Sequence, residues 1–195
     1  MKVSDYIVRT LAAHAVRNVF VVAGGMIAHL LDSLFKNDDV KTVVTRHEQA
    51  AAFAAGAVGR TTGLPGIACA TSGPGATNLL TGIADCYYDS APALFITGQV
   101  NRYEQKGTRG VRQFGFQECD IAALAEHVTK AAWRVQDQAN CLLCLKERSS
   151  CPYPDGQARC FSTCRWMSSG RKFRNLRRGP VRCAGTPLAR RPPQT

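Results

Sequence analysis

Short apolar runs alternate with longer helical patterns along the first 135 residues of this chain. The apolar runs have the length of strands and occupy residues 19–23, 40–45, 66–72, 93–98 and 129–135. Helical periodicity lies between them, at residues 4–14, 26–35, 48–60, 76–89 and 120–128. Such alternation is typical of βα crossovers, which place parallel strands in one sheet and cover both of its faces with helices. The pattern therefore predicts an α/β fold built as a three-layer αβα domain with a parallel sheet.

The first predicted helix has both a start signal and a buried face. Ser4 is a residue type that caps helix starts, because its hydroxyl can accept a hydrogen bond from a backbone amide of the first turn. Tyr6, Ile7, Leu11 and Ala15 follow at helical spacing on one face. We expect Ser4 to be the N-cap and these four residues to face the sheet.

Polar and glycine residues follow the predicted strands. The first four strands lead into residues 23–25, 46–48, 72–75 and 98–99. In open parallel sheets, ligands bind outside the carboxyl ends of the strands. The sequence therefore predicts a site at this edge of the sheet.

Each motif at this edge also has an ordinary structural explanation when it is taken alone. Residues 72–75 lack the lysine of a Walker A loop and the glycine spacing of a dinucleotide fingerprint, so a tight turn explains them as well as a ligand contact does. Gly24 and Gly25 have the same two explanations. Glu48 suits the first turn of a helix, where an acid gains roughly 0.3–1 kcal/mol from the helix dipole. His47 fits a cap or surface residue better than a metal ligand, because no second ligand stands at helical spacing.

The last sixty residues have a different composition. Residues 1–135 carry 13 Lys+Arg and 11 Asp+Glu, whereas residues 136–195 carry 12 and 3, so most of the net charge of +11 lies in the tail. Six of the nine cysteines and six of the nine prolines are also there. Such a composition buries too little apolar surface to offset chain entropy. We expect a folded domain over residues 1–135 and a basic, poorly structured tail over residues 136–195.

The tail has three interpretations. Cys141 and Cys144, with Cys160 and Cys164, approximate a four-cysteine zinc site, but the second pair is spaced one residue too widely. The arginines could contact the phosphates of RNA, although a run of charges is more often simply solvated. We favour the third interpretation, a truncated or frameshifted gene after about residue 137, because Arg, Cys, Ser, Gly and Pro are what a GC-rich gene yields out of frame. We therefore expect no bound metal and no nucleic acid.

Three segments, in this order and spacing, carry a specific resemblance. They are RHEQAAAFAAGAVGR at residues 46–60, TSGPGATNLLTGIADCYYDSAPALFITGQV at residues 71–100, and FGFQE at residues 114–118. The chain as far as about Val135 resembles the N-terminal pyrimidine-binding domain of thiamine-diphosphate enzymes, and most closely that of acetolactate synthase large subunits. Sulfoacetaldehyde acetyltransferase, glyoxylate carboligase, oxalyl-CoA decarboxylase and pyruvate oxidase share much of this domain, so the activity stays open.

The resemblance implies a chemical role for Glu48. In the family, the glutamate of the R-H-E-x-A motif hydrogen-bonds N1′ of the cofactor's aminopyrimidine ring and relays the proton that activates the thiazolium C2. Alanines at positions 50, 51, 52 and 54 are expected to let that ring and a facing subunit approach the helix.

The resemblance also implies the remaining site residues. Glu48 and Gln117 are the implied catalytic residues, and Phe116 and Gln117 are the implied substrate-facing pair. The implied cofactor-binding residues are Gly24, Gly25, Glu48, Pro74, Gly75 and Asn78. Ala23 stands where the family's Pro-Gly-Gly turn has its proline.

The family's diphosphate-binding domain is not represented in this sequence. That domain holds Mg²⁺ with a G-D-G motif and a later Asn, whereas the nearest string here is Pro154-Asp155-Gly156. We therefore expect this chain to contact only the pyrimidine half of thiamine diphosphate. The resemblance places Mg²⁺ on the missing domain and allows FAD in the full-length enzymes.

Two functions are compatible with these residues. The first is the N-terminal half-site of a transferase of branched-chain amino acid biosynthesis that joins 2-oxo acids such as pyruvate, homo-oligomeric at full length and without turnover as an isolated chain. The second is a non-catalytic module that pairs with a full-length relative. No apolar run reaches the roughly 20 residues of a membrane span, and the N-terminus lacks a signal-peptide core. We expect a cytoplasmic protein.

Overall fold

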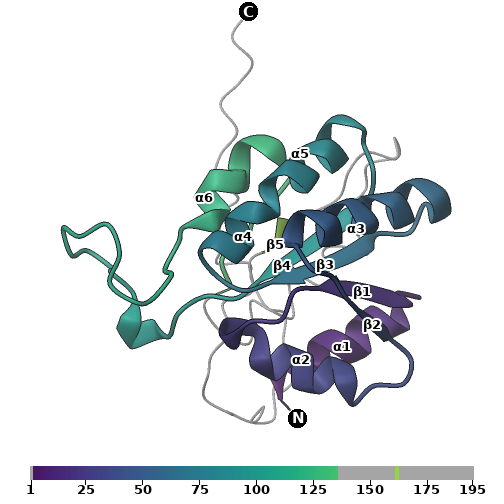
Figure 1. The fold of residues 1–195 in the computed structure, drawn as a ribbon, viewed down its shortest axis with the longest axis horizontal. Coiled ribbons are helices and arrows are strands. Elements are labelled where there is room, and N and C mark those ends of the chain that lie inside the picture. The colour runs from purple at the N-terminus through teal and green to yellow at the C-terminus, as the bar shows by residue number, and fades with distance from the viewer. Residues whose placement is uncertain (1, 136–160, 163–195) are drawn as a thin grey trace, which may run out of the picture.

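The computed structural model describes residues 2–135 and 161–162 and contains one parallel sheet (Figure 1). Its strands are β1 (Asn18–Val21), β2 (Lys41–Val44), β3 (Gly66–Ala70), β4 (Ala93–Thr97) and β5 (Phe161–Ser162). The strands are hydrogen-bonded in the order β2-β1-β3-β4-β5, and every pair is parallel. The predicted α/β class with a parallel sheet is confirmed.

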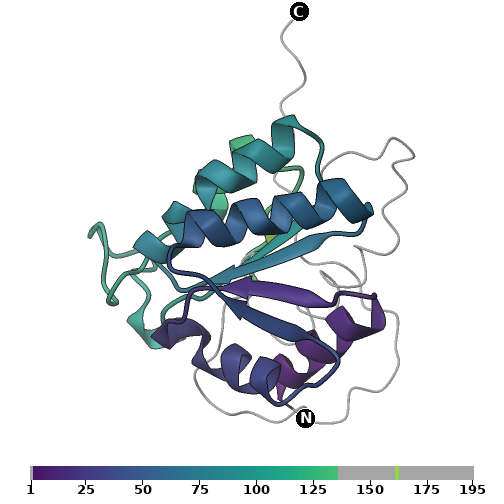
Figure 2. The ribbon, with the colours of Figure 1, turned by 45° about the vertical axis from the view of Figure 1, so that its right-hand side comes forward.

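Helices cover both faces of the sheet, as the alternating pattern predicts. The α-helices are α1 (Val3–Ala13), α2 (Ala28–Phe35), α3 (Glu48–Thr62), α4 (Pro74–Asn78), α5 (Leu80–Tyr88) and α6 (Ile121–Ala125). Three short 3₁₀ turns are η1 (Gly25–Ile27), η2 (Arg102–Glu104) and η3 (Glu126–Val128). Figures 1 and 2 show α1 and α2 on one face of the sheet and α3, α4, α5 and α6 on the other.

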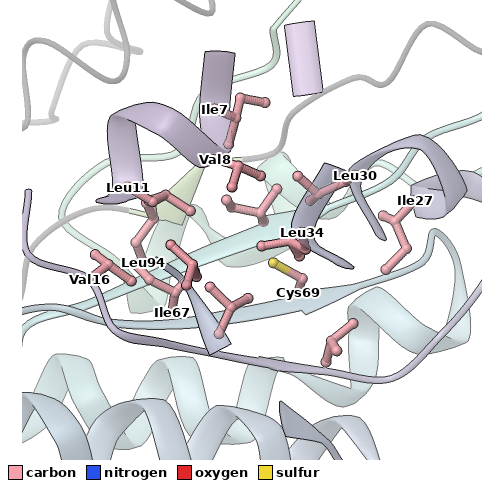
Figure 3. Packing of buried hydrophobic residues seen from close by; sticks show 14 of the residues in the cluster. Ile7, Val8, Leu11, Val16, Ile27, Leu30, Leu34, Ile67, Cys69 and Leu94 are labelled. Carbon is pink, nitrogen blue, oxygen red and sulfur yellow. The ribbon is translucent and has the colours of Figure 1, made fainter. Parts of the chain in front are cut away.

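The layer of α1 and α2 is held by a core of large aliphatic side chains (Figure 3). Ile7 and Leu11 of α1 and Leu30 of α2 are almost fully buried, and they share this core with Val19 and Ile67 of the sheet. Complete burial of such a side chain stabilises the fold by roughly 1.5–3 kcal/mol. The packing of this layer against β1 and β3 holds in place the strands that lead to the predicted site.

The opposite layer packs through small residues. A methyl group at Gly66 of β3 would lie 1.9 Å from the carbonyl oxygen of Ala55, and one at Gly82 of α5 would lie 2.4 Å from the Cβ of Ala52. Helix α3 therefore lies directly on the sheet and on α5. Ala51 is also completely buried here.

Of the four alanines expected to let a ring and a facing subunit approach α3, only two lie on an outer face of the domain. Ala51 and Ala52 are buried within the domain, so their small size serves contacts inside this chain and not a ring or a facing subunit. Ala50 is exposed and Ala54 is half-buried. These two remain on the outer surface of α3.

Two expectations about the first helix are wrong. Ser4 is not the N-cap: it lies inside α1 and is completely buried, and the amide of Lys2 instead donates to Asp5 Oδ2 at 3.1 Å. Ala15 lies beyond the helix end, exposed, with a left-handed φ of 59°. The N-cap is Lys2, two residues before the expected one, and the helix is held to α2 by polar contacts, so local capping preference does not decide its start.

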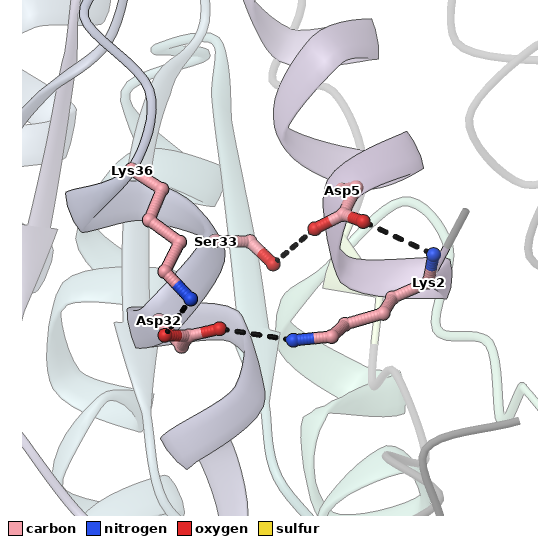
Figure 4. A network of polar contacts seen from close by, with 5 residues as sticks. All are labelled: Lys2, Asp5, Asp32, Ser33 and Lys36. Atoms are coloured by element: carbon pink, nitrogen blue, oxygen red, sulfur yellow. Dashed lines mark hydrogen bonds and ion pairs between the residues drawn. The ribbon is translucent and has the colours of Figure 1, made fainter. Parts of the chain in front are cut away.

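The contacts between α1 and α2 form a small polar network (Figure 4). Ser33 Oγ donates to Asp5 Oδ1 at 2.8 Å, and Lys2 Nζ lies 3.0 Å from Asp32 Oδ2. Lys36 Nζ lies 2.7 Å from the other oxygen of Asp32. The network joins the N-terminal end of α1 to the C-terminal half of α2.

The strand predicted at residues 129–135 is also wrong. Residues 129–133 form a bend and an irregular segment, and only Arg134 makes an isolated bridge. On the side of β4 away from β3, the neighbouring strand is β5, in which Phe161 pairs with Phe95. Which segment pairs with β4 depends on residues far away in the sequence, so a local pattern does not predict it.

Strand β5 belongs to the segment for which no strand pattern was predicted. The other residues after 135 lie outside the described part of the chain. The predicted cysteine pairs, the basic cluster and the out-of-frame interpretation fall on those residues, and the boundary at residue 135 stays a prediction.

Candidate functional site

The segments that follow four neighbouring strands meet at one edge of the sheet. Gly24 follows β1, Glu48 follows β2, residues 73–75 follow β3, and Gly98 follows β4. Because these strands are parallel and adjacent, their carboxyl ends lie side by side (Figure 1). The edge predicted to carry a site is thus assembled from four separate parts of the sequence.

Glu48 is the first residue of α3, and His47 caps that helix. The Nδ1 of His47 accepts a hydrogen bond from the amide of Gln49 at 3.2 Å, and its ring is exposed. The interpretation of His47 as a cap is therefore confirmed. Glu48 is half-buried in the first turn, where the helix dipole favours a negative charge.

The carboxylate of Glu48 is held on one side only. Asn78 Nδ2, at the end of α4, donates to Glu48 Oε2 at 3.0 Å. Among the described residues no group donates to the other oxygen, Oε1. A methyl group at Gly75 would lie 2.7 Å from Thr71 Cγ2 and 3.2 Å from Oε1, so the absence of a side chain at Gly75 lets α4 pack closely against Thr71 and Glu48. The arrangement presents one oriented acceptor to a ligand.

Thr71 is a member of this edge that the sequence analysis did not assign. A methyl group at Gly24 would lie 2.5 Å from the Cβ of Thr71, and one at Gly75 would lie 2.7 Å from its Cγ2. The Thr71 side chain therefore lies between the turn after β1 and the start of α4. Glycine is required at both positions by this close approach. In the sequence, Thr71 stands directly before the Ser-Gly-Pro-Gly turn, and this position is the signal that could have identified it as a site residue.

Gly24 and Gly25 differ in their surroundings although they are adjacent. A methyl group at Gly25 would meet no atom within 4 Å, whereas Gly24 is packed against Thr71. Gly25 therefore has open space beside it. Both residues lie at the predicted edge.

Gln117 and Gly73 are in contact, and both have a left-handed backbone. The φ angle is 57° for Gln117 and 61° for Gly73. A methyl group at Gly73 would lie 2.7 Å from the Cβ of Gln117, so the loop that carries Gln117 lies directly on the turn after β3. Left-handed φ is uncommon for a residue such as glutamine. Phe116, beside it, is 75% exposed.

Apart from Gly24 and Gly25, which follow β1, the predicted site residues fall into two groups. Glu48, Gly75 and Asn78 are brought together around one carboxylate, and Pro74 opens the helix that carries the last two. Phe116 and Gln117 lie on a separate loop that touches the same turn at Gly73.

The described residues contain neither a cluster of metal ligands nor a membrane-spanning helix. No group of three or more His, Cys, Asp or Glu side chains in residues 2–135 and 161–162 is placed to hold a metal ion. None of the helices in this part of the chain combines the length and apolar character that crossing a membrane requires.

The sequence matches known proteins over the same part of the chain. Residues 1–124 match the family model described as thiamine pyrophosphate enzyme, N-terminal TPP binding domain. Acetolactate synthase 2, chloroplastic, from Nicotiana tabacum is 40% identical over 136 residues, which is 70% of this chain and 20% of that protein. The acetolactate synthase isozyme 2 large subunit of Escherichia coli (strain K12) is 41% identical over 136 residues, 70% of this chain and 24% of that protein.

An archaeal relative gives the same result. The probable acetolactate synthase large subunit of Methanocaldococcus jannaschii is 40% identical over 136 residues, 70% of this chain and 22% of that protein. The chain thus spans about a fifth to a quarter of the length of these relatives. The family model and the relatives agree with the parallel sheet and its glycine-rich edge. The chain belongs to the thiamine pyrophosphate enzymes, and it carries the N-terminal TPP-binding domain of the acetolactate-synthase-like members of that family.

Proposed function

We propose that this chain supplies the pyrimidine half of a catalytic site that decarboxylates pyruvate and joins the product to a second 2-oxo acid. The observation that carries the proposal is the Glu48 carboxylate, whose Oε2 is held by Asn78 and whose Oε1 lies next to Gly75. An oriented acceptor next to a glycine suits the edge of a flat heterocycle better than it suits a bulky ligand. The high similarity to acetolactate synthases supports the choice of reaction.

Glu48 is proposed to hold a proton at N1′ of the aminopyrimidine ring. The cofactor, when bound, supplies an electron-accepting ring for the electrons released on decarboxylation. Asn78 holds Oε2 of the carboxylate, which would leave Oε1 to bond the ring nitrogen. Positioned acid–base groups of this kind contribute typically 10²–10⁴-fold to a rate.

The remaining edge residues are proposed to shape the pyrimidine pocket and its entrance. Gly24, Gly25 and Gly75 would let backbone come close to the ring without side-chain bulk, and Pro74 begins the helix that carries Gly75. Phe116 and Gln117 are proposed to face the 2-oxo acid, with Gln117 as a hydrogen-bonding catalytic residue. The contact of Gln117 with Gly73 supports this placement, because it brings the loop to the same turn.

The other half of the site is proposed to come from a diphosphate-binding domain. That domain would hold the diphosphate and Mg²⁺ through oxygen ligands, and a homo-oligomer would bring the two halves together. FAD and a cytoplasmic location belong to the same proposal for the full-length enzyme. Without a diphosphate domain, we expect residues 1–135 to show no turnover.

A chimeric enzyme tests the reaction class. Residues 1–135 replace the matching segment of the Escherichia coli isozyme 2 large subunit, and product formation is measured with pyruvate, sulfoacetaldehyde, glyoxylate and oxalyl-CoA. We expect acetolactate from pyruvate. A folded chimera that binds thiamine diphosphate but prefers another of these substrates would overturn the choice of reaction. A folded chimera without any turnover would favour a non-catalytic pairing module.

A further inference from the structure

The segment between β4 and α6 is a long loop that leaves the sheet and returns to it (Figure 1). Most of it is exposed, including the apolar side chains of Tyr103, Val111 and Phe114. It therefore has little apolar burial to define its shape. Compact loops of this kind depend on contacts made by their own residues.

The carboxylate of Glu118 makes the main contacts within this loop. The amide of Lys106 donates to Glu118 Oε1 at 2.9 Å and to Oε2 at 3.0 Å. The amide of Phe114 also donates to Oε2, at 3.0 Å. The Glu118 carboxylate thus joins Lys106, twelve residues earlier, to Phe114, four residues earlier. An ordinary solvated surface acid would not accept two backbone amides, so the contact is specific to this loop.

Smaller contacts support the same loop conformation. Gly115 is buried, and a methyl group there would lie 2.7 Å from the carbonyl oxygen of Glu104. Arg109 Nη1 donates to the carbonyl oxygen of Gln105 at 2.7 Å, and its guanidinium lies 4.4 Å from the centre of the Phe114 ring. The bond from Arg109 is also charge-assisted but exposed, as is the bond from Phe114, whereas the two bonds from Lys106 to Glu118 are part-buried.

The loop ends directly at the residues proposed to face the substrate. Gln117, next to Glu118, has the left-handed φ of 57° and packs on Gly73. A left-handed non-glycine residue persists only where its surroundings fix it, because the conformation itself is unfavourable. The carboxylate of the following residue, Glu118, is held by two amides of the same loop.

We propose that Glu118 is a positioning residue that holds Phe116 and Gln117 at the turn after β3. The substrate-facing role of that pair rests on the proposed function, whereas the restraint by Glu118 rests on the contacts above. Glu118 itself acts through the amides of Lys106 and Phe114.

Amide hydrogen exchange of the full chain tests the restraint. In Glu118→Ala, exchange at Lys106 and Phe114 should accelerate about tenfold or more, because a bond between an amide and a charged acceptor is lost. Glu118→Gln should give an intermediate value, since its single carbonyl oxygen can still accept. Glu126→Ala, at an exposed acid of η3, should leave both amides unchanged. Unchanged exchange in Glu118→Ala would overturn the proposal.

A second readout follows Gln117 itself. The wild-type chain should show a nuclear Overhauser contact between the α-protons of Gly73 and the β-protons of Gln117, which Glu118→Ala should lose and Glu118→Gln should retain. Persistence of that contact in Glu118→Ala would contradict a positioning role even if the amides exchange faster. Both measurements need no cofactor, so they can fail while the proposed function holds, and the chimera can fail while they succeed.

Discussion

Asn78 and Glu48 lie thirty residues apart in the sequence, and a hydrogen bond of 3.0 Å joins Asn78 Nδ2 to Glu48 Oε2. The bond connects the end of α4 to the first turn of α3. It links the glycine-rich turn after β3 to the acid after β2, and it leaves one carboxylate oxygen available to a ligand. The contribution of this bond to the stability of the fold can be measured.

A double-mutant cycle measures the coupling between the two residues. Asn78→Ala should lower the free energy of unfolding by about 1–2 kcal/mol, because a hydrogen bond to a half-buried carboxylate is lost. The same substitution in a Glu48→Ala background should cost clearly less. Urea unfolding of the four chains gives the coupling energy. Strictly additive effects would show that the bond contributes nothing.

Gly24 and Gly25 provide a matched pair for the packing of the first turn. Gly24→Ala should destabilise the fold by about 1–3 kcal/mol, since its methyl group would clash with Thr71. Gly25→Ala should change stability by less than about 0.5 kcal/mol, because the space beside it is open. Thermal unfolding of both variants checks the difference. Equal losses at the two positions would rule out Thr71 as the cause.

Ala15 offers a substitution that should stabilise the protein. Its φ of 59° is unfavourable for alanine and accessible to glycine. Ala15→Gly should therefore raise the free energy of unfolding by about 0.5–1 kcal/mol. Ala13→Gly, two residues earlier at the exposed end of α1, should instead lower it by a similar amount. Urea unfolding distinguishes the signs, and a loss at both positions would contradict the left-handed assignment.

Asp120 gives the fold a dependence on acid pH. Burial would raise the pKa of this carboxyl, but the hydrogen bond and the charge of Arg134 outweigh it, so the pKa is lowered from 3.8. A lowered pKa in the folded state stabilises the protein above the unfolded value, and that stabilisation disappears as pH falls through the folded pKa. Asp120→Asn keeps a side chain that can cap α6 while removing the charge.

The difference in melting temperature between wild type and Asp120→Asn should therefore be largest near neutral pH and shrink below about pH 4. Added salt should reduce it, because both side chains are partly exposed. A difference that does not change between pH 7 and pH 2 would show that the ion pair with Arg134 does not contribute.

The first four strands could be predicted because their patterns are local. Buried parallel strands are continuous apolar runs, and the predicted 93–98 run became β4 (Ala93–Thr97) almost unchanged. The strand predicted at residues 129–135 failed because strand pairing with β4 is a long-range choice, which β5 satisfies instead. Ser4 failed as a cap because tertiary packing buries it inside α1.

The candidate site was predictable in position but not in its contacts. Parallel topology alone places Glu48 and residues 73–75 at one edge. The bond from Asn78 depends on where the short helix α4 ends, and the contact of Gln117 with Gly73 depends on a loop fold held by Glu118. Neither of these two contacts leaves a periodic pattern in the sequence. Thr71 stands directly before the turn in the sequence, but its contacts with Gly24 and Gly75 depend on the packing of three separate segments.

We propose that Glu48 controls the proton at N1′ of the cofactor's pyrimidine ring. The most direct measurement is the exchange rate of the C2 proton of thiamine diphosphate bound to the chimeric enzyme, with Glu126→Gln as the control for an exposed acid. Glu48→Gln should slow this exchange by about 100-fold or more, while the control should leave it unchanged. An unchanged exchange rate in a Glu48→Gln enzyme that still binds the cofactor would contradict the claim.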